Sequence, residues 1–147
     1  MILMDGYWTK REAQPDAAID ATGSTGVKWT WMCPFEKAAI VSLVTGVTAA
    51  TGAVSTGGVL TFYHTNYAGT KTALGSYTVL ASKPIYSSQT IDLDKGTNGS
   101  GRVRGIIDLP VVRKGEVITA ELTTQGSGGT QSVKPAIVFI EKEADTI

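Results

Sequence analysis

The segment Arg113-Lys114-Gly115-Glu116 carries three charges in four residues and is the first place to look for chemistry. The residues after it, Val117 to Leu122, alternate between apolar and polar side chains, a period of two that is typical of a strand. Gly115 suits the turn that would lead into such a strand. The pattern therefore predicts a solvated turn that carries charges, and not a charged site.

Two nearby pairs of carboxylates are the next candidates, because polysaccharide-cleaving enzymes require paired carboxylates in a cleft. Asp92 and Asp94 have the spacing of the start of an EF-hand calcium loop. Gly96 and Val103, however, stand where two further ligands would be. Residues two apart on a strand share one face, so the first pair is predicted to lie on a solvated strand face.

The second carboxylate pair, Glu116 and Glu121, is not accompanied by other residues of a catalytic site. The single histidine, His64, excludes any site that needs two imidazoles, and no serine lies in a Gly-x-Ser-x-Gly motif. The single cysteine, Cys33, lies among large apolar residues in WTWMCPF, which indicates a buried side chain and not a reactive thiol. We therefore expect a protein that is not an enzyme, with no catalytic residues, no metal site and no cofactor.

Two tryptophans could instead form a binding platform. Trp29 and Trp31 would share one face of a strand, where a pair of indoles could stack on sugar rings or on single-stranded bases. Val27 would extend the same apolar face, which favours burial in the core. The sequence leaves open whether these two side chains belong to the core or bind a ligand.

Composition narrows the classes of partner. Thirteen basic residues balance thirteen acidic ones, and charged residues make up 18% of the 147 residues. A net charge of zero does not provide the basic surface of a nucleic-acid-binding protein, whereas a low-charge surface favours association with other proteins. The N-terminus lacks a basic n-region and no apolar run approaches the roughly 20 residues of a membrane helix, so we expect a soluble protein made in the cytoplasm.

From Val27 onward the elements that must position these residues are strands separated by Gly-rich turns. Strands are expected within residues 27–35, 37–49, 57–66, 71–82, 89–96, 101–110, 112–124 and 134–143. Seven to eight short strands without a sustained helical pattern predict an all-β fold, an antiparallel sandwich or barrel.

Residues 1–26 lack the period-two hydrophobic pattern of residues 27–147, which we assign to the β-sandwich domain. Sustained periodicity is weak in this N-terminal part, although Pro15 could begin a short helix over residues 15–21. We interpret residues 1–26 as an extended N-terminal arm ordered by a neighbouring molecule, and the alternative is that its aromatic residues pack on the chain's own core. The residues of the arm predicted to bind the partner are Met1, Ile2, Leu3, Met4, Tyr7 and Trp8.

Three segments carry a family resemblance: CPFEKAAIVSLV, in which a strand follows a proline, GGVLTFYHT, and above all LPVVRKGEVITAELTT. In texture and strand order, residues 27–143 resemble the jelly-roll domains of tailed-bacteriophage virion proteins, particularly the cement or decoration proteins of capsids. In such folds the third segment turns the chain into a long penultimate strand. The resemblance supplies no catalytic residues to carry over to this sequence.

The resemblance implies a non-enzymatic structural protein, made in the host cytoplasm and located on the capsid exterior of the virion. It would bind the outer surface of the major capsid protein and stabilise the phage head as a cement or decoration protein. In line with the composition, we expect neither nucleic acid nor a membrane as a partner. It also implies a homo-oligomer, a homotrimer. The main alternative is a carbohydrate- or receptor-binding β-sandwich module of a virion or cell surface.

Overall fold

The computed structural model describes residues 8–51, 56–79, 88–93 and 109–142. The described residues form ten strands and no helix. The strands are β1 (Trp8–Ala13), β2 (Ile19–Asp20), β3 (Gly26–Met32), β4 (Lys37–Thr51), β5 (Val59–Thr65), β6 (Lys71–Thr78), β7 (Ser88–Asp92), β8 (Val111–Arg113), β9 (Val117–Thr124) and β10 (Thr130–Lys142). The predicted all-β class is confirmed, and the short helix considered for residues 15–21 is wrong because this segment contains β2.

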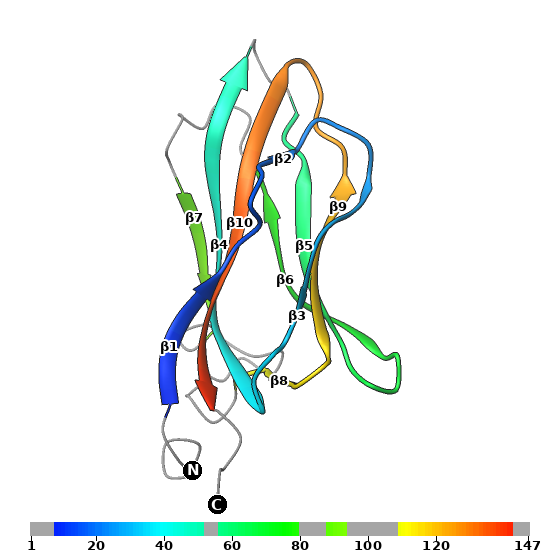
Figure 1. The fold of residues 1–147 in the computed structure, drawn as a ribbon. Helices are drawn as coiled ribbons and strands as arrows, with labels where there is room; N and C mark the ends of the chain where they lie inside the picture. Colours follow the sequence, from blue (N-terminus) through cyan, green and yellow to red (C-terminus); the bar gives the residue numbers. More distant parts are fainter. Residues whose placement is uncertain (1–7, 52–55, 80–87, 94–108, 143–147) are drawn as a thin grey trace, which may run out of the picture.

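The strands form two antiparallel sheets that face each other as two layers (Figure 1). The six-stranded sheet has the order β1-β10-β4-β7, with β2 paired to β10 and β8 paired to β4. The four-stranded sheet has the order β3-β9-β5-β6. The eight longer strands change sheet at every connection except the β5–β6 hairpin, which is the jelly-roll arrangement. Seven of the strands, β3 to β7, β9 and β10, coincide with predicted ones, whereas β1, β2 and β8 were not predicted. The strand expected within residues 101–110 lies mostly outside the described residues.

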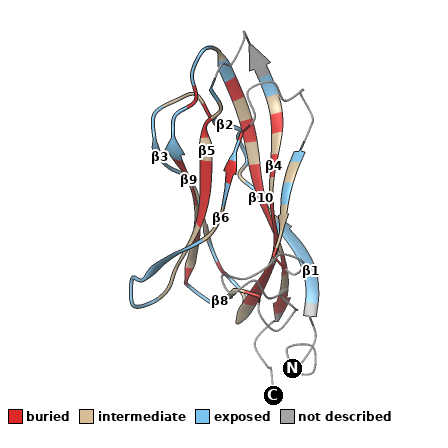
Figure 2. Ribbon diagram, turned by 180° about the vertical axis from the view of Figure 1, so that it is seen from behind, coloured by how far each residue is buried: buried red, intermediate tan, exposed pale blue. Residues whose placement is uncertain are grey.

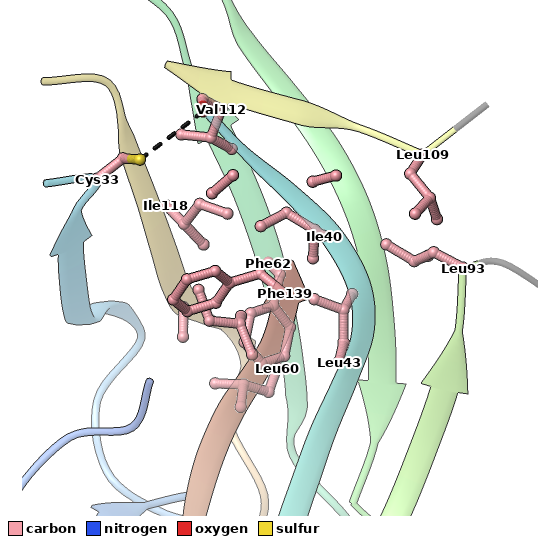
Figure 3. Packing of buried hydrophobic residues seen from close by; sticks show 14 of the residues in the cluster. Cys33, Ile40, Leu43, Leu60, Phe62, Leu93, Leu109, Val112, Ile118 and Phe139 are labelled. Atoms are coloured by element: carbon pink, nitrogen blue, oxygen red, sulfur yellow. Dashed lines mark hydrogen bonds between the residues drawn. The ribbon is translucent and has the colours of Figure 1, made fainter. Parts of the chain in front are cut away.

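The core lies between the two sheets. Figure 2 shows buried residues along β4, β5, β9 and β10, whereas β1 is exposed over most of its length. The alternation predicted for β5 is confirmed at Leu60 and Phe62, which are fully buried. Figure 3 shows Ile40, Phe62 and Phe139 converging from β4, β5 and β10. Burial of one such side chain stabilises the fold by about 2 kcal/mol, so this interdigitation holds the layers together.

The central strand β4 is bent by two irregularities in its pairing with β10. Val41 and Thr48 are the extra residues, because their neighbours on either side pair with consecutive residues of β10. An extra residue bends a strand and increases its twist. The six-stranded sheet is therefore curved, and its outer face is not flat.

The described part of the predicted N-terminal arm belongs to the six-stranded sheet. β1 pairs with β10 from Trp8 opposite Lys142 to Ala13 opposite Ile137. Further along, Ile19 and Ala21 are buried in a second core cluster that contains Val133. Residues 1–7 lie outside the described residues, and the idea that the arm gains its order from a neighbour stays a prediction.

Backbone hydrogen bonds hold together one end of the sandwich, which we call the glycine end. Residue 21, residues 56–58 and residues 126–127 meet there. The Gly126 N–H donates to the Ala21 carbonyl at 3.0 Å, and the Ser127 N–H donates to the Thr56 carbonyl at 2.9 Å. A Cβ atom on Gly58 would overlap the carbonyl oxygen of Ala21. The close approach of these segments therefore requires a residue without a side chain at position 58.

Candidate functional site

At the opposite end of the sandwich a buried carboxylate joins three segments, and we call this region the carboxylate end. It comprises Cys33, the loop of residues 66–70 between β5 and β6, and the turn of residues 113–116 between β8 and β9. The carboxylate belongs to Glu116, which is 6% exposed. The backbone brings the turn to Cys33, because the Cys33 N–H donates to the Glu116 carbonyl and the Gly115 N–H donates to the Cys33 carbonyl, both at 2.9 Å.

Both side-chain oxygens of Glu116 accept hydrogen bonds. The Arg113 N–H donates to Oε1 at 2.9 Å, and the Tyr67 N–H donates to Oε2 at 3.1 Å. Nε2 of His64, at the end of β5, lies 3.0 Å from Oε1. One side chain therefore connects β5, the loop after it and the β8–β9 turn.

The electrostatics of Glu116 follow from these contacts. Burial raises the pKa of Glu116, but the hydrogen bonds from Arg113, His64 and Tyr67 lower it by more, so the net pKa lies below its ordinary value. The carboxylate is therefore held in its charged form. All of these contacts lie within the chain, so the Glu116 carboxylate fixes the β5–β6 loop and the β8–β9 turn in position.

The turn itself depends on its glycine. Gly115 has a φ of 86°, a left-handed conformation that glycine adopts without a steric penalty. A Cβ atom there would also lie 3.4 Å from the ring of Tyr67, which is 71% exposed. The prediction of a turn at Gly115 is confirmed. The prediction that all its charges are solvated holds for Arg113 and Lys114, which are exposed, and is wrong for Glu116.

Cys33 does not form a nucleophilic pair with His64 in this structure. Its thiol donates to the Val112 carbonyl at 3.7 Å, as Figure 3 shows, and to the Phe35 carbonyl at 3.5 Å. Burial raises the pKa of this thiol above its ordinary value of 9.0. The thiol is therefore protonated at neutral pH and unreactive, as the sequence predicted.

The two tryptophans pack on the core. The ring of Trp31 lies 4.9 Å from that of Phe139, centroid to centroid, and Trp29 contacts both core clusters. The expectation that Val27 extends their face is wrong, because the β3–β9 register shifts between Val27 and Trp29 and leaves Val27 55% exposed. Sequence periodicity cannot reveal a bulge whose cause is the pairing with another strand.

The remaining carboxylates considered from the sequence do not form pairs. Asp92 accepts a hydrogen bond from the Ser42 hydroxyl at 2.9 Å, and Asp94 lies outside the described residues. Glu121 forms an ion pair with Lys71 on the outer face of the four-stranded sheet, away from the contacts of Glu116. Among the described residues no group of three or more His, Cys, Asp or Glu side chains is arranged to hold a metal ion.

The residues predicted to bind a partner cannot be assembled into a site. Met1, Ile2, Leu3, Met4 and Tyr7 lie outside the described residues, and Trp8 is the first residue of β1. The described part of the chain contains no helix that is long and apolar enough to cross a membrane.

A hollow that the sequence did not indicate lies on the outer face of the six-stranded sheet, with a volume of about 460 Å³. It extends over four strands, from β1 through β10 and β4 to β7. The residues that line it are Lys10, Arg11, Glu12, Ser42, Val44, Thr90 and Val138. The guanidinium of Arg11 is paired with Glu141 at 3.2 Å and lies over the ring of Phe35. No single segment carries a recognisable motif for it, because the lining comes from four strands that are far apart in the sequence.

Comparisons with known proteins give little guidance. No family model matches the chain, and no curated protein matches it. One similar solved structure is described as "Structure of infectious bursal disease virus Gx strain", with 14% sequence identity and a TM-score of 0.28. The match covers 95% of this chain and 37% of that one. A likeness at this TM-score carries no argument about fold or function.

Proposed function

We propose that this chain is a non-enzymatic virion structural protein that binds the outer surface of a major capsid protein and stabilises the shell as a cement or decoration protein. Jelly rolls are a recurrent fold of viral capsid domains, which supports the general class but not a specific role. The proposed place of action is the capsid exterior, and the proposed assembly is a homotrimer. Synthesis in the host cytoplasm belongs to the same proposal.

The observation that carries the proposal is the free edge of β3. Within the described residues β3 pairs with β9 on one side only. Val27 and Met32 on this strand are 55% and 64% exposed, and Lys28 is its single charged residue. Unpaired, weakly charged strand edges favour pairing with another chain, and proteins that must stay apart usually block them with charges.

The edge of β1 provides the contrast. Three successive residues of β1 are charged, Lys10, Arg11 and Glu12. Such an edge discourages pairing with another strand, whereas that of β3 permits it. Two other strands that pair on one side only within the described residues, β6 and β7, carry one charged residue each, but neither has a large exposed apolar side chain. The exposed side chains of Val27 and Met32 therefore favour β3 for the contact with a neighbour.

Binding to the assembled shell would stabilise it by mass action, because a ligand that binds only the assembled state raises the cost of disassembly. Many copies on a symmetric lattice would multiply modest individual contacts. The N-terminal residues Met1, Ile2, Leu3, Met4, Tyr7 and Trp8 are proposed to contribute to the same contact.

The test is co-sedimentation of the purified full chain with intact particles that lack it, followed by measurement of copies per particle. The proposal expects saturation at a number that matches the symmetry positions of the shell. Met32→Lys should abolish binding, whereas Thr78→Lys on the edge strand β6 should not, since both positions are exposed and only the first lies on the proposed edge. A folded chain that shows no saturable binding would refute the role.

A shortened chain that lacks residues 1–7 tests the arm separately. This deletion keeps β1 intact, whereas removal of residues 1–26 would also take away Ile19 and Ala21, which are buried in the core. Weaker binding by the shortened chain is expected. Unchanged binding would remove the arm from the proposal and leave the β3 edge in it.

A further inference from the structure

The hollow on the outer face of the six-stranded sheet has the composition of a ligand site. One row of paired residues crosses the whole sheet: Glu12 of β1 lies opposite Val138 of β10, Val138 lies opposite Ser42 of β4, and Ser42 lies opposite Asp92 of β7. Residues paired in this way point to the same face. The row therefore places a carboxylate at each end, with a methyl-bearing side chain and a hydroxyl between them.

The neighbouring row adds to the same face. Val44 of β4 lies opposite Thr90 of β7, and both line the hollow together with Lys10. The middle of the hollow is thus formed by short side chains, while longer charged side chains stand on β1. With strands about 4.8 Å apart, the two carboxylate-bearing strands are separated by roughly 14 Å, enough for a small ligand to lie between them.

One polar group on the floor is fixed in position. Ser42 is 8% exposed, and its hydroxyl donates to Oδ1 of Asp92 at 2.9 Å. This bond orients the Asp92 carboxylate across β4 and β7. A carboxylate held by a neighbour loses less conformational entropy on binding than a freely rotating one.

The volume and the chemistry of the lining define the ligand class. About 460 Å³ falls within the range of small-molecule sites, roughly 300 to 1,000 Å³. The lining carries an acceptor from Glu12 and a donor from Lys10, while Val44 and Val138 offer apolar contact. The guanidinium of Arg11, which also belongs to the lining, is paired with Glu141, and Asp92 adjoins the lining through its bond to Ser42. A ligand that fits must present hydroxyl groups at its edge and C–H groups on its face, without a large net charge.

We propose that this hollow binds a neutral saccharide of one or two sugar rings. Hydroxyl groups of the sugar would donate to the Glu12 and Asp92 carboxylates, and its C–H face would rest on Val44 and Val138. This site is independent of capsid binding through β3, because β3 belongs to the other sheet. It also differs from a tryptophan platform, since Trp29 and Trp31 pack on the core.

The test uses the full chain labelled with ¹⁵N and a panel of neutral sugars, namely glucose, galactose, N-acetylglucosamine, maltose, cellobiose and lactose, with glucuronate as a charged comparator. At millimolar concentration at least one neutral sugar is expected to shift the amide resonances of β1, β4 and β7 around the hollow. Glucuronate is expected to bind more weakly because the carboxylates of Glu12 in the lining and of Asp92 beside it repel it. Shifts confined to the four-stranded sheet, stronger binding of glucuronate, or no shift with any neutral sugar would overturn the proposal.

Variants assign the contacts. Glu12→Gln and Asp92→Asn should each raise the Kd of the best sugar by about tenfold, because a hydrogen bond to a charged group is lost. The matched control is Glu121→Gln on the outer face of the four-stranded sheet, which should leave the Kd unchanged. Glu12 is exposed, so its substitution should not unfold the chain even where that of Asp92 does. Equal Kd values for Glu12→Gln and the unaltered chain would remove Glu12 from the site and contradict the proposed geometry.

Discussion

The carboxylate end and the glycine end of the sandwich solve the same problem with different chemistry. Both must bring loops from opposite sheets together without leaving buried polar groups unpaired. At the carboxylate end Glu116 accepts hydrogen bonds from two backbone N–H groups and contacts His64. At the glycine end the backbones pair with one another directly, and Gly58 and Gly126 permit the approach.

The two solutions differ in what a mutation can disturb. The stability of the carboxylate end depends on the charge and length of one side chain, so it should change with substitution of that residue and with pH. The stability of the glycine end depends on the absence of side chains and should change mainly when volume is added.

Glu116→Ala should have the largest effect, lowering the free energy of unfolding by about 3 to 5 kcal/mol. The substitution leaves the N–H groups of Arg113 and Tyr67 without their acceptor, and it also removes the partner of His64. Urea denaturation followed by tryptophan fluorescence measures the loss. Glu116→Gln retains one acceptor oxygen and should cost less than the alanine variant; equal costs for both would show that the hydrogen bonds are not what matters.

Gly58→Ala tests the other end and should cost about 3 kcal/mol, the upper part of the range for added volume in a packed site. The new Cβ atom would overlap the Ala21 carbonyl, a backbone group that cannot turn away. Gly23→Ala is the matched control, because the nearest side-chain atom there belongs to the exposed Asp20, at 3.3 Å. Similar thermal midpoints for the two variants would contradict the tight packing at position 58.

The pH dependence of stability should separate the ends further. The folded-state pKa of Glu116 lies below its ordinary value of 4.5, so its contribution is present above about pH 4.5 and is lost as the pH falls through the folded-state pKa. The pKa of Asp20, near the glycine end, is also lowered, chiefly by the Thr22 hydroxyl. Urea midpoints between pH 6 and pH 3 should fall less for Glu116→Gln than for the unaltered chain.

Asp20→Asn provides the comparison for this pH experiment. Asp20 is exposed, so its hydrogen bonds with Thr22 compete with water. The acid loss of stability in this variant should therefore stay close to that of the unaltered chain. If the asparagine variant flattened the pH profile more than Glu116→Gln does, the acid sensitivity would belong to the glycine end.

Gln125→Ala should have the smallest effect, about 0.5 kcal/mol or less. Its side-chain amide donates to the Thr22 carbonyl at 2.9 Å, but both groups lie at the surface of the glycine end. Water can replace the amide there. A calorimetric loss as large as that of Gly58→Ala would show that side chains, and not backbone packing, hold this end.

The fold was more accessible from the sequence than the details of these ends. Period-two patterns identified β5 and β9, because inward-facing residues such as Leu60 and Ile118 repeat along one strand. The burial of Glu116 was missed, since its partners His64 and Tyr67 lie about 50 residues away and only the fold brings them near. The outer-face hollow was missed for the same reason, as its lining comes from four strands.

The single thiol gives the carboxylate end a consequence of its own. Cys33 is the one cysteine of the chain and is 1% exposed, with its sulfur near the carbonyl oxygens of Phe35 and Val112. An alkylating reagent can reach it only when the surrounding segments separate, so the rate of alkylation measures how often this end opens. Alkylation of the native thiol therefore reports local opening of the carboxylate end and does not report opening of the glycine end.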